Sequence, residues 1–326
     1  MTHPTRVRRV MLLGATGTIG RAAAAAIVAE GYQLVCFVRP GAAVDTGLPS
    51  GCEIRFGQVT DPSSLRQDGF RGETFDVLVS CLASRSGVPA DAWKIDYRTH
   101  VDALAVAKGA GVGHMVLLSA ICVQKPKLSF QHAKLAFENN LIDSGLTYSI
   151  VRPTAYFKSL SGQIGRLQRG KPYLLFGDGQ ITATKPISDG DLGRFIARCI
   201  GDPQLHEKVL PIGGPGDAKT PRQQGEALFV LLGRKPHFRR VPVALLDVIV
   251  AILKVLGWFS PRLAAKAELA RIGRYYATES MLVWDAAAGE YDAAATPSFG
   301  NETLDDFYAR LISGEEMLER GHHTVF

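Results

Sequence analysis

The chain has 326 residues, of which 46% are hydrophobic and 21% are charged, and its formal net charge is +6. This composition is typical of a folded globular protein and excludes a disordered or fibrous chain. Lysine and arginine form no long block, so the sequence predicts no nucleic-acid partner, whereas the positive charge favours an anionic ligand.

The spacing of the cysteines and histidines argues against disulfides and against a metal site. The five cysteines include no Cys-x-x-Cys pair, and the eight histidines show no His-x-x-x-His spacing. We therefore predict free, buried thiols in a reducing compartment, without disulfides and without a metal site.

The first predicted element is a strand that ends at a glycine-rich turn and leads into an alanine-rich helix. The sequence is Val10-Met-Leu-Leu-Gly14-Ala-Thr-Gly17-Thr-Ile-Gly20-Arg21. Glycine permits a sharp turn and the close approach of a pyrophosphate, and the helix N-terminus offers free N–H groups to the phosphates. The Gly-x-x-Gly-x-x-Gly spacing resembles the short-chain dehydrogenase/reductase superfamily, above all its extended and atypical branches. This unit predicts a dinucleotide site made by Gly14, Thr16, Gly17, Thr18, Ile19 and Gly20.

The second predicted strand, residues 33–38, ends at Arg39 and not at an acidic residue. In dinucleotide sites an acidic residue here binds the ribose 2′-hydroxyl of NAD, and a basic residue suits the 2′-phosphate of NADP. The planar guanidinium matches phosphate geometry. We therefore predict NADPH as the cofactor, with Arg39 as its main 2′-phosphate contact and Arg21 as a second one. A solvated turn arginine is the alternative for Arg39.

The third predicted strand, residues 52–56, leads into Gln58 and Val59. In the superfamily that the glycine spacing resembles, an acidic residue and an apolar residue often hold the adenine at this turn. Gln58 replaces the acid, and its amide oxygen can still accept a hydrogen bond from the adenine amino group. The resemblance therefore implies adenine contacts from Gln58 and Val59.

Further strands are predicted at 75–79, 114–118 and 147–153, with helices at 92–110 and 134–144 between them. Such alternation predicts an α/β protein with a Rossmann-like, doubly wound parallel sheet. Ligands bind at the carboxyl ends of the strands in these sheets. Ala83 and Ser119, which follow the fourth and fifth strands, are therefore expected beside the cofactor.

The regular alternation ends near residue 155. We predict an NADP-binding domain at 1–155, rejoined by about 183–212, where a strand at 186–189 precedes a helix from Asp191. Residues 156–182 and 213–326 are predicted to form a smaller, mostly helical substrate-binding cap. Within this cap, residues 243–259 predict an amphipathic helix that shields the substrate and is too short to span a membrane. Contact of its apolar face with a membrane surface is part of this prediction, and core packing alone is the alternative.

The run Phe130-Gln-His-Ala-Lys134 stands where members of the superfamily carry a Tyr-x-x-x-Lys pair. The lysine is retained, and the proton-transferring tyrosine is replaced by phenylalanine. Carbonyl and alcohol interconversion is therefore not expected. Hydride delivery to a polarised C=C bond fits better, with Lys134 as the catalytic and ribose-holding residue.

The segment from Phe130 to Glu138 and the run Gly145-Leu-Thr-Tyr-Ser-Ile-Val-Arg152-Pro153-Thr-Ala-Tyr-Phe-Lys158 carry a closer resemblance. They look like the NADPH-dependent 3,8-divinyl (proto)chlorophyllide 8-vinyl reductases, which are atypical, NmrA-like members of the superfamily. The runs Phe176-Gly-Asp-Gly179, Lys185-Pro-Ile-Ser188 and Ala277-Thr-Glu-Ser-Met281 support it. The resemblance implies reduction of the 8-vinyl group of divinyl chlorophyllide or protochlorophyllide to ethyl, in (bacterio)chlorophyll biosynthesis.

Substrate contacts are expected from Tyr156, Phe157 and Lys158, the last facing a substrate carboxylate. Core packing for the two aromatic residues and a solvated face for Lys158 are the alternatives. No signal peptide and no plastid transit segment is recognised, so we expect a cytoplasmic protein of a bacterial phototroph. An NADP-binding regulator without catalysis, or a C=C reductase of plant-phenolic type, are the competing functions. The sequence specifies no oligomeric state.

Overall fold

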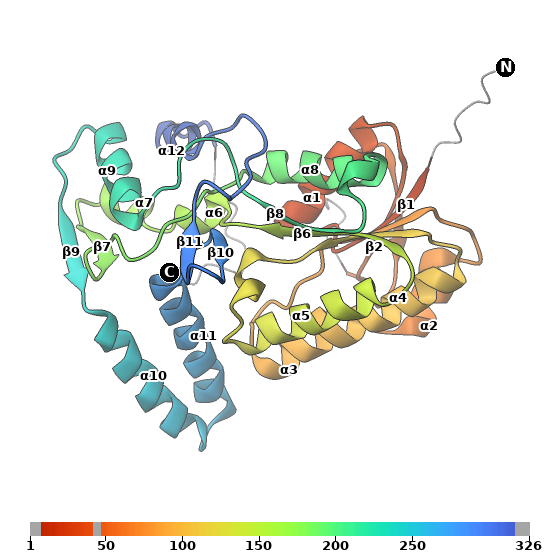
Figure 1. The fold of residues 1–326 in the computed structure, drawn as a ribbon, viewed down its shortest axis with the longest axis horizontal. Helices are drawn as coiled ribbons and strands as arrows, with labels where there is room; N and C mark the ends of the chain where they lie inside the picture. Colours follow the sequence, from red (N-terminus) through yellow and green to blue (C-terminus); the bar gives the residue numbers. More distant parts are fainter. Residues whose placement is uncertain (1–7, 42–46, 317–326) are drawn as a thin grey trace.

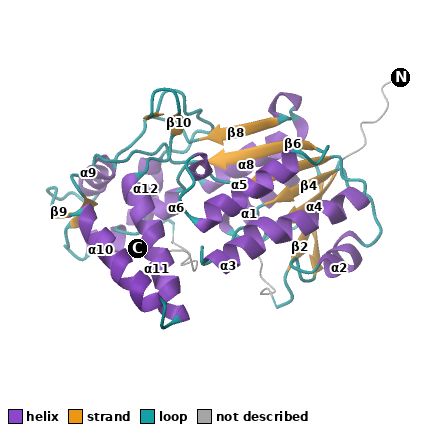
Figure 2. Cartoon of the chain, turned by 60° about the horizontal axis from the view of Figure 1, so that its bottom comes forward, coloured by secondary structure: helices purple, strands orange, loops and turns teal. Residues whose placement is uncertain are grey.

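The computed structural model of this chain describes residues 8–41 and 47–316. Its main body is a seven-stranded sheet of order β3-β2-β1-β4-β5-β6-β8, and every neighbouring pair of strands is parallel (Figures 1 and 2). The order reverses beside β1, so the predicted Rossmann-like, doubly wound fold is confirmed. The strands are β1 (Arg9–Leu13), β2 (Gln33–Val38), β3 (Cys52–Phe56), β4 (Val77–Ser80), β5 (His114–Leu118), β6 (Thr147–Pro153) and β8 (Lys208–Ile212).

Two apolar cores cover the two faces of the sheet, because successive strand residues point to opposite sides. Val10 and Leu12 of β1 belong to the core beneath α1 (Thr18–Ala29) and α8 (Asp189–Gly201). Met11 and Leu13 belong to the core beneath α4 (His100–Gly109) and α5 (Ser129–Ile142). Small residues let α1 and α8 touch, since a Cβ on Gly193 would lie 2.5 Å from the backbone of Ala22.

The seventh strand and the start of α8 differ from the sequence prediction. Strand β8 was not foreseen, because it lies at the sheet edge, carries exposed Lys208 and Val209, and contains a proline. The strand predicted at 186–189 is only an isolated bridge between Tyr156 and Ile187. Helix α8 then begins directly, with the Ser188 hydroxyl accepting the Asp191 N–H at 3.0 Å.

The helix predicted at 92–110 is longer and irregular. It consists of α3 (Pro89–Ala92), a π-helical stretch (Trp93–Thr99) and α4. Single π-helical turns inside α-helices often occur at functional sites, because they re-aim side chains that a regular helix would align. Asp96, in the middle of this stretch, is one of the buried residues of the chain.

A second lobe is built from residues 156–182 and from the chain after 213. Its core joins Phe157, Tyr173, Leu228 and Phe307, so both segments predicted for the cap contribute to it. Strand β7 (Tyr173–Phe176) pairs with β9 (Phe238–Val241), and β10 (Val283–Asp285) pairs with β11 (Glu290–Asp292). Its helices are α6 (Phe157–Leu160), α7 (Ile164–Gln168), α9 (Pro221–Leu231), α10 (Val243–Gly257), α11 (Pro261–Thr278) and α12 (Leu304–Ser313).

The helix expected at 243–259 forms, but its apolar face is not in a core. None of the residues of α10 is buried. The helix packs on α11, and α11 lies between it and the nucleotide-binding half (Figure 1). Core packing alone, the alternative given for this helix, therefore does not account for its apolar face, because α11 covers only one side of α10. No helix in the described part of the chain is long and apolar enough to cross a membrane.

Candidate cofactor and active site

The glycine-rich turn between β1 and α1 has the geometry that a dinucleotide site requires. Gly14 adopts a φ of +78°, and a Cβ there would lie 2.6 Å from the backbone of Cys81. A Cβ on Gly20 would lie 2.1 Å from the Gly14 carbonyl oxygen, so this glycine lets α1 sit on the turn. Gly14 and Gly20 are thus required by the fold itself.

The fold itself does not require glycine at position 17, where φ is −75°. A Cβ there would meet only the Gly14 oxygen, at 3.4 Å, so the protein leaves the space in front of α1 open. Gly17 is the N-cap of α1, and no side chain caps the helix. The first-turn N–H groups of Thr18, Ile19 and Gly20 therefore point at open space with the positive end of the helix dipole, as an anion site demands. These residues fit a bound pyrophosphate.

The residues assigned to the adenosine half lie along the same sheet edge. Arg39 is exposed directly after β2, and Gln58 is exposed after β3 with its N–H bonded to Ser64 Oγ at 2.9 Å. Val59 is half-buried against the core. Arg21 lies in the first turn of α1, where a Cβ on Gly47 would be 3.1 Å from its Cδ. Arg39 thus follows the strand that pairs with β1, and Arg21 lies on the helix that follows β1.

Ala83 and Ser119 follow β4 and β5, as expected, but they differ in what they offer. Ala83 is exposed in the loop after β4. Ser119 is 4% exposed, and its hydroxyl donates to the buried carboxylate of Glu138. Glu138 in turn pairs with Arg152. The Ser119 hydroxyl proton is thus committed inside the protein, and its cofactor role stays a prediction.

Lys134 lies on α5 and forms a nearly buried ion pair. Its ammonium is 3.0 Å from Asp96 Oδ1, and the two side chains are 11% and 0% exposed. The same oxygen accepts the N–H of Ser84 at 3.2 Å, while Asp96 Oδ2 has no hydrogen-bond partner. Because β4 ends just before Ser84, Asp96 joins Lys134 to the loop at the cofactor edge.

A neutral histidine lies beside this pair. His100 Nδ1 donates to the Ile95 carbonyl at 2.9 Å, which leaves Nε2 to accept the Ser80 hydroxyl at 2.8 Å. Burial and, to a smaller extent, the charge of Lys134 lower the pKa of His100 to about 4. The pair Asp96–Lys134 therefore has no second cation from His100 at neutral pH.

Asp96 and His100 are not among the residues predicted above, although the sequence carries a signal for them. Ala92, Asp96, His100, Ala103 and Ala107 recur at helical spacing, and all are buried. A carboxylate on an otherwise small and apolar helix face needs a partner. The partner is Lys134, which only the tertiary structure identifies.

Phe130, which stands in the tyrosine position, serves as a contact between the two lobes. It packs against a cluster that contains Cys122, Ile272, Tyr275 and Met281. The Tyr275 hydroxyl bonds to the carbonyls of Cys122 and Lys125, at 3.1 and 3.2 Å. Helix α11 is thus attached to the loop after β5, and Phe130 lies in that junction.

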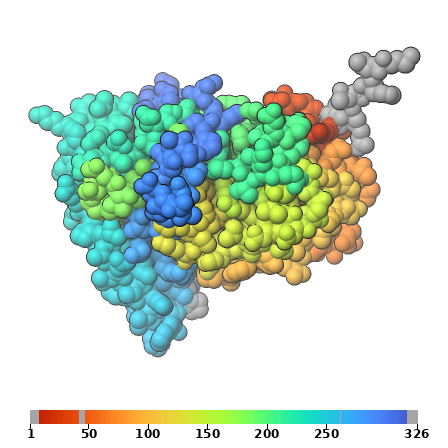
Figure 3. Space-filling view, viewed as in Figure 1, coloured from red at the N-terminus to blue at the C-terminus, as the bar shows by residue number. Residues whose placement is uncertain are grey.

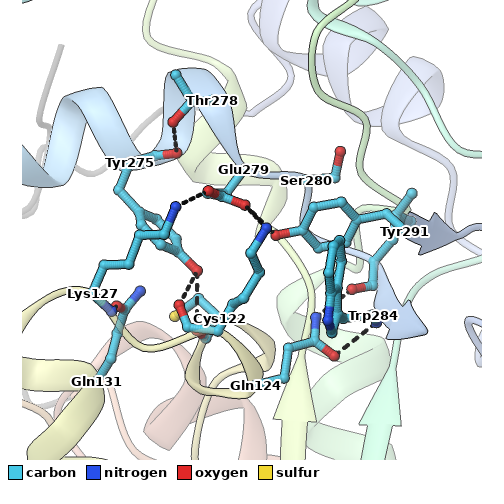
Figure 4. Close-up of polar contacts among 12 residues, drawn as sticks. Cys122, Gln124, Lys127, Gln131, Tyr275, Thr278, Glu279, Ser280, Trp284 and Tyr291 are labelled. Carbon is cyan, nitrogen blue, oxygen red and sulfur yellow. Dashed lines mark hydrogen bonds and ion pairs between the residues drawn. The ribbon is translucent and has the colours of Figure 1, made fainter. Parts of the chain in front are cut away.

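A polar cluster at Glu279 fastens the same loop to the second lobe (Figure 4). Lys125 contacts the carboxylate of Glu279 at 2.8 Å, Lys127 pairs with it too, and the Tyr291 hydroxyl donates to it at 2.6 Å. Burial alone would raise the pKa of Glu279, but these three donors outweigh burial and lower it to about 2. Lys125 also lies 3.9 Å from the centre of the Trp284 ring.

The predicted substrate residues have different environments. Tyr156 is half-buried against the main core, and burial raises the pKa of its hydroxyl. Phe157 is 2% exposed and packs on Phe307 in the core of the second lobe. Lys158 is half-buried near Asp189, whose pKa burial raises to about 6 against the opposing charge of Lys158. Tyr156 and Lys158 keep accessible surface, and Phe157 fills the core, the alternative given for it above.

The described residues contain free cysteines and no metal-like cluster. All five cysteines carry free thiols; Cys36, Cys122 and Cys199 are buried, as predicted, whereas Cys52 and Cys81 are only half-buried. Among the residues that the structure describes, no group of His, Cys, Asp and Glu side chains is arranged to hold a metal ion.

Comparisons with known proteins agree with this geometry. A family model described as NAD(P)H-binding matches residues 14–203. The divinyl chlorophyllide a 8-vinyl-reductase, chloroplastic, of Oryza sativa subsp. indica is 46% identical over 97% of this chain and 82% of its own length.

Solved structures share the fold at low identity. The NADPH complex of the quinone oxidoreductase QOR2 from Escherichia coli has a TM-score of 0.68 and 20% identity, over 93% of this chain and 99% of that one. The NADPH complex of leucoanthocyanidin reductase from Vitis vinifera has a TM-score of 0.65 and 14% identity, over 94% and 99%. By its sequence, the chain belongs to the NAD(P)H-binding divinyl chlorophyllide a 8-vinyl-reductase family.

Proposed function

We propose that this protein reduces the 8-vinyl group of divinyl chlorophyllide a, or of its protochlorophyllide counterpart, to an ethyl group with NADPH. The observation that carries the proposal is the near full-length match to the reductase family together with an open, uncapped helix N-terminus at the glycine-rich turn. NADPH supplies a hydride when it is bound. The chain is thus an oxidoreductase of chlorophyll biosynthesis.

The cofactor contacts follow from the sheet edge. Gly14, Thr16, Gly17 and the first turn of α1 hold the pyrophosphate, and Arg39 takes the 2′-phosphate of NADPH. Arg21 adds positive charge close to the same turn. Gln58 and Val59 line the adenine, and Lys134 holds the nicotinamide ribose from the opposite end of the site.

Lys134 and Phe130 explain why this site suits a C=C bond. The vinyl group is conjugated with the macrocycle, so the addition of a hydride at its terminal carbon leaves negative charge spread over the ring. No alkoxide forms, and a tyrosine proton at position 130 is not required. The protein therefore acts by positioning and by excluding bulk water, and the completing proton comes from a water molecule in the site or from a side chain other than Phe130.

The alternative functions have less support. Lys134 and Asp96 form a nearly buried ion pair, and burying two charges costs desolvation free energy. A regulator that only binds the cofactor does not need such a pair beside the cofactor, whereas an enzyme that positions the nicotinamide does. A reductase of plant phenolics is supported by the fold alone, because the solved relatives of that kind are under 20% identical.

Purified protein with NADPH and divinyl chlorophyllide tests the proposal. Loss of the conjugated vinyl group shifts the Soret band to shorter wavelength, and the product mass rises by two hydrogens. NADPH oxidation without this product, or product formation without NADPH, would contradict the assignment.

A peripheral contact with a membrane is also part of the proposal. Its support is the exposed apolar face of α10. Such a contact would bring the enzyme to the lipid phase in which a chlorophyll precursor partitions.

A further inference from the structure

Helix α10 exposes a continuous apolar stripe at helical spacing. Its exposed fractions run from 37% at Ile249 to 56% at Val255. The turn that follows exposes Trp258 by 81% and Phe259 by 83%. This stripe comprises Leu245, Val248, Ile249, Ile252, Val255, Leu256 and Phe259.

The protein covers only the other side of α10. The half-buried positions of α10 are Val243, Leu246, Val250, Leu253 and Gly257, and a Cβ on Gly257 would lie 3.0 Å from Ala264 of α11. Asp247 pairs with Arg274 of α11. The stripe therefore faces away from α11, and in Figure 3 this segment forms the cyan outer edge of the molecule. A contiguous apolar surface of this kind marks an interaction site.

The charges around the stripe favour one partner. Residues 234–274 contain nine lysines and arginines and only two acidic residues. Both acids are paired, Asp247 with Arg274 and Glu268 with Arg271. Exposed Arg239 and Arg240 precede α10, and exposed Arg262 and Lys266 follow its tip. An apolar stripe with basic residues at both ends matches a helix lying in the interface of an anionic membrane.

A second copy of the chain fits this surface poorly. A two-fold contact would set each patch against itself, so the unpaired basic residues would meet their own copies. An anionic lipid surface offers acyl chains to the stripe and headgroups to the cations. Exposed Trp258 suits the boundary between them, since tryptophan is enriched at membrane interfaces.

We propose that α10 and the Trp258–Phe259 turn dock this protein on an anionic lipid surface. This proposal deepens the peripheral membrane contact proposed above. The docking itself is independent of the proposed reaction, and only its biological purpose rests on that reaction. The docking element is connected to the active site through α11. Tyr275 bonds to the Cys122 carbonyl, and Ile272 packs against the loop after β4, where a Cβ on Gly87 would lie 2.6 Å away. Substrate dissolved in the lipid then reaches the site from the α11 side.

Flotation of the full chain with vesicles tests the proposal without substrate or NADPH. Vesicles of equal parts phosphatidylcholine and phosphatidylglycerol should bind the protein, and added salt should weaken binding. The double variant Ile252→Asp/Val255→Asp should lose more than about tenfold in affinity, since it removes buried apolar contacts from the bound state. Arg239→Gln/Arg240→Gln should lower binding to anionic vesicles and leave binding to pure phosphatidylcholine unchanged.

Val230→Asp is the matched control, because Val230 is 77% exposed on α9, outside the stripe. It should bind vesicles like the parent chain. Failure of the parent chain to bind, or full binding by the double aspartate variant, overturns the proposal. A dimer in light scattering that the double variant dissolves, without vesicle binding, assigns the stripe to a second copy instead. Reductase turnover of each variant with detergent-dispersed substrate is measured separately, so a failed reaction is distinguishable from failed docking.

Discussion

The cofactor preference depends on one side chain at the end of β2. Arg39 is exposed there, next to the phosphate-binding turn. We expect Arg39→Ala to weaken NADPH binding by on the order of 1.5–3 kcal/mol and to leave NADH binding nearly unchanged, because only NADPH carries the 2′-phosphate. Titration of both cofactors by fluorescence measures this. Arg98→Ala is the control, because Arg98 is an exposed arginine of the π-helical stretch that pairs with Asp102 and has no predicted cofactor contact. Equal losses for the two cofactors would refute the role.

Lys134 needs a more careful variant than simple truncation. Lys134→Ala leaves the buried carboxylate of Asp96 unpaired, which costs about 3–5 kcal/mol of stability. Turnover should fall by about a hundredfold through lost positioning. The double variant Lys134→Ala/Asp96→Ala should recover the melting temperature without recovering turnover. If turnover returned together with stability, Lys134 would be structural only.

Phe130→Tyr completes the test of this mechanism. Restoring the hydroxyl should give little gain in rate, because the developing charge lies on the macrocycle and not on an alkoxide. The ring now packs against the Cys122 and Tyr275 cluster, so the added hydroxyl also meets an apolar surface. A much faster Phe130→Tyr enzyme in steady-state assays would contradict the mechanism.

Asp96 is a positioning residue, since it touches Lys134 and the loop after β4. Asp96→Asn keeps an acceptor for the Ser84 N–H and removes the charge that holds Lys134. We expect kcat to fall about tenfold and the Kd for NADPH to rise, with the KM for substrate nearly unchanged. Asp91→Asn is the matched control, because Asp91 accepts the N–H of Arg85 and of Ser86 in the same loop, each at 3.2 Å. Identical effects of the two variants would show that Asp96 only holds the loop after β4 and does not position Lys134.

Among the elements, the segment after α11 shows how polar contacts fix the second lobe. Glu279 follows α11 and is held by Lys125, Lys127 and Tyr291. Its folded pKa, about 2, lies below the ordinary 4.5. The stabilisation is therefore complete above pH 4.5 and is lost as pH falls towards 2, where the folded carboxylate also takes up a proton.

Glu279→Gln should cost about 1–3 kcal/mol at neutral pH and should flatten the acid side of the stability curve. Denaturant unfolding at a series of pH values measures both. Glu290→Gln, an exposed acid on β11, should leave the curve unchanged. A Glu279→Gln protein that loses stability equally at pH 2 and at pH 7 would show that the cause is packing and not charge.

Helices α1 and α10 show how far an element can be inferred from its own residues. The glycine spacing of α1 predicts where the helix starts, because Gly14 and Gly20 each answer a local steric demand. The apolar periodicity of α10 predicts a helix equally well. It does not say which side is covered, because burial depends on where α11 packs.

At the scale of the whole molecule, the sheet and the second lobe interlock along the chain. Strand β8 is the last strand of the main sheet in chain order, and the chain reaches it only after β7 has formed part of the second lobe. Gly213 then bridges to Ser298, and Phe195 of α8 packs on Phe299. The lobes are therefore joined by backbone pairing as well as by side chains, and the loop after β5 lies between them.

The sequence by itself determined the parallel sheet, the phosphate-binding turn and the reductase family, because these depend on local periodicity, on glycine spacing and on matched motifs. Only the tertiary structure decided that Asp96 holds Lys134, that Glu279 gathers two lysines, and that the stripe of α10 is exposed. These features join residues far apart in the chain, so no local pattern specifies them. They depend on how the faces of separate helices and strands come to lie against one another.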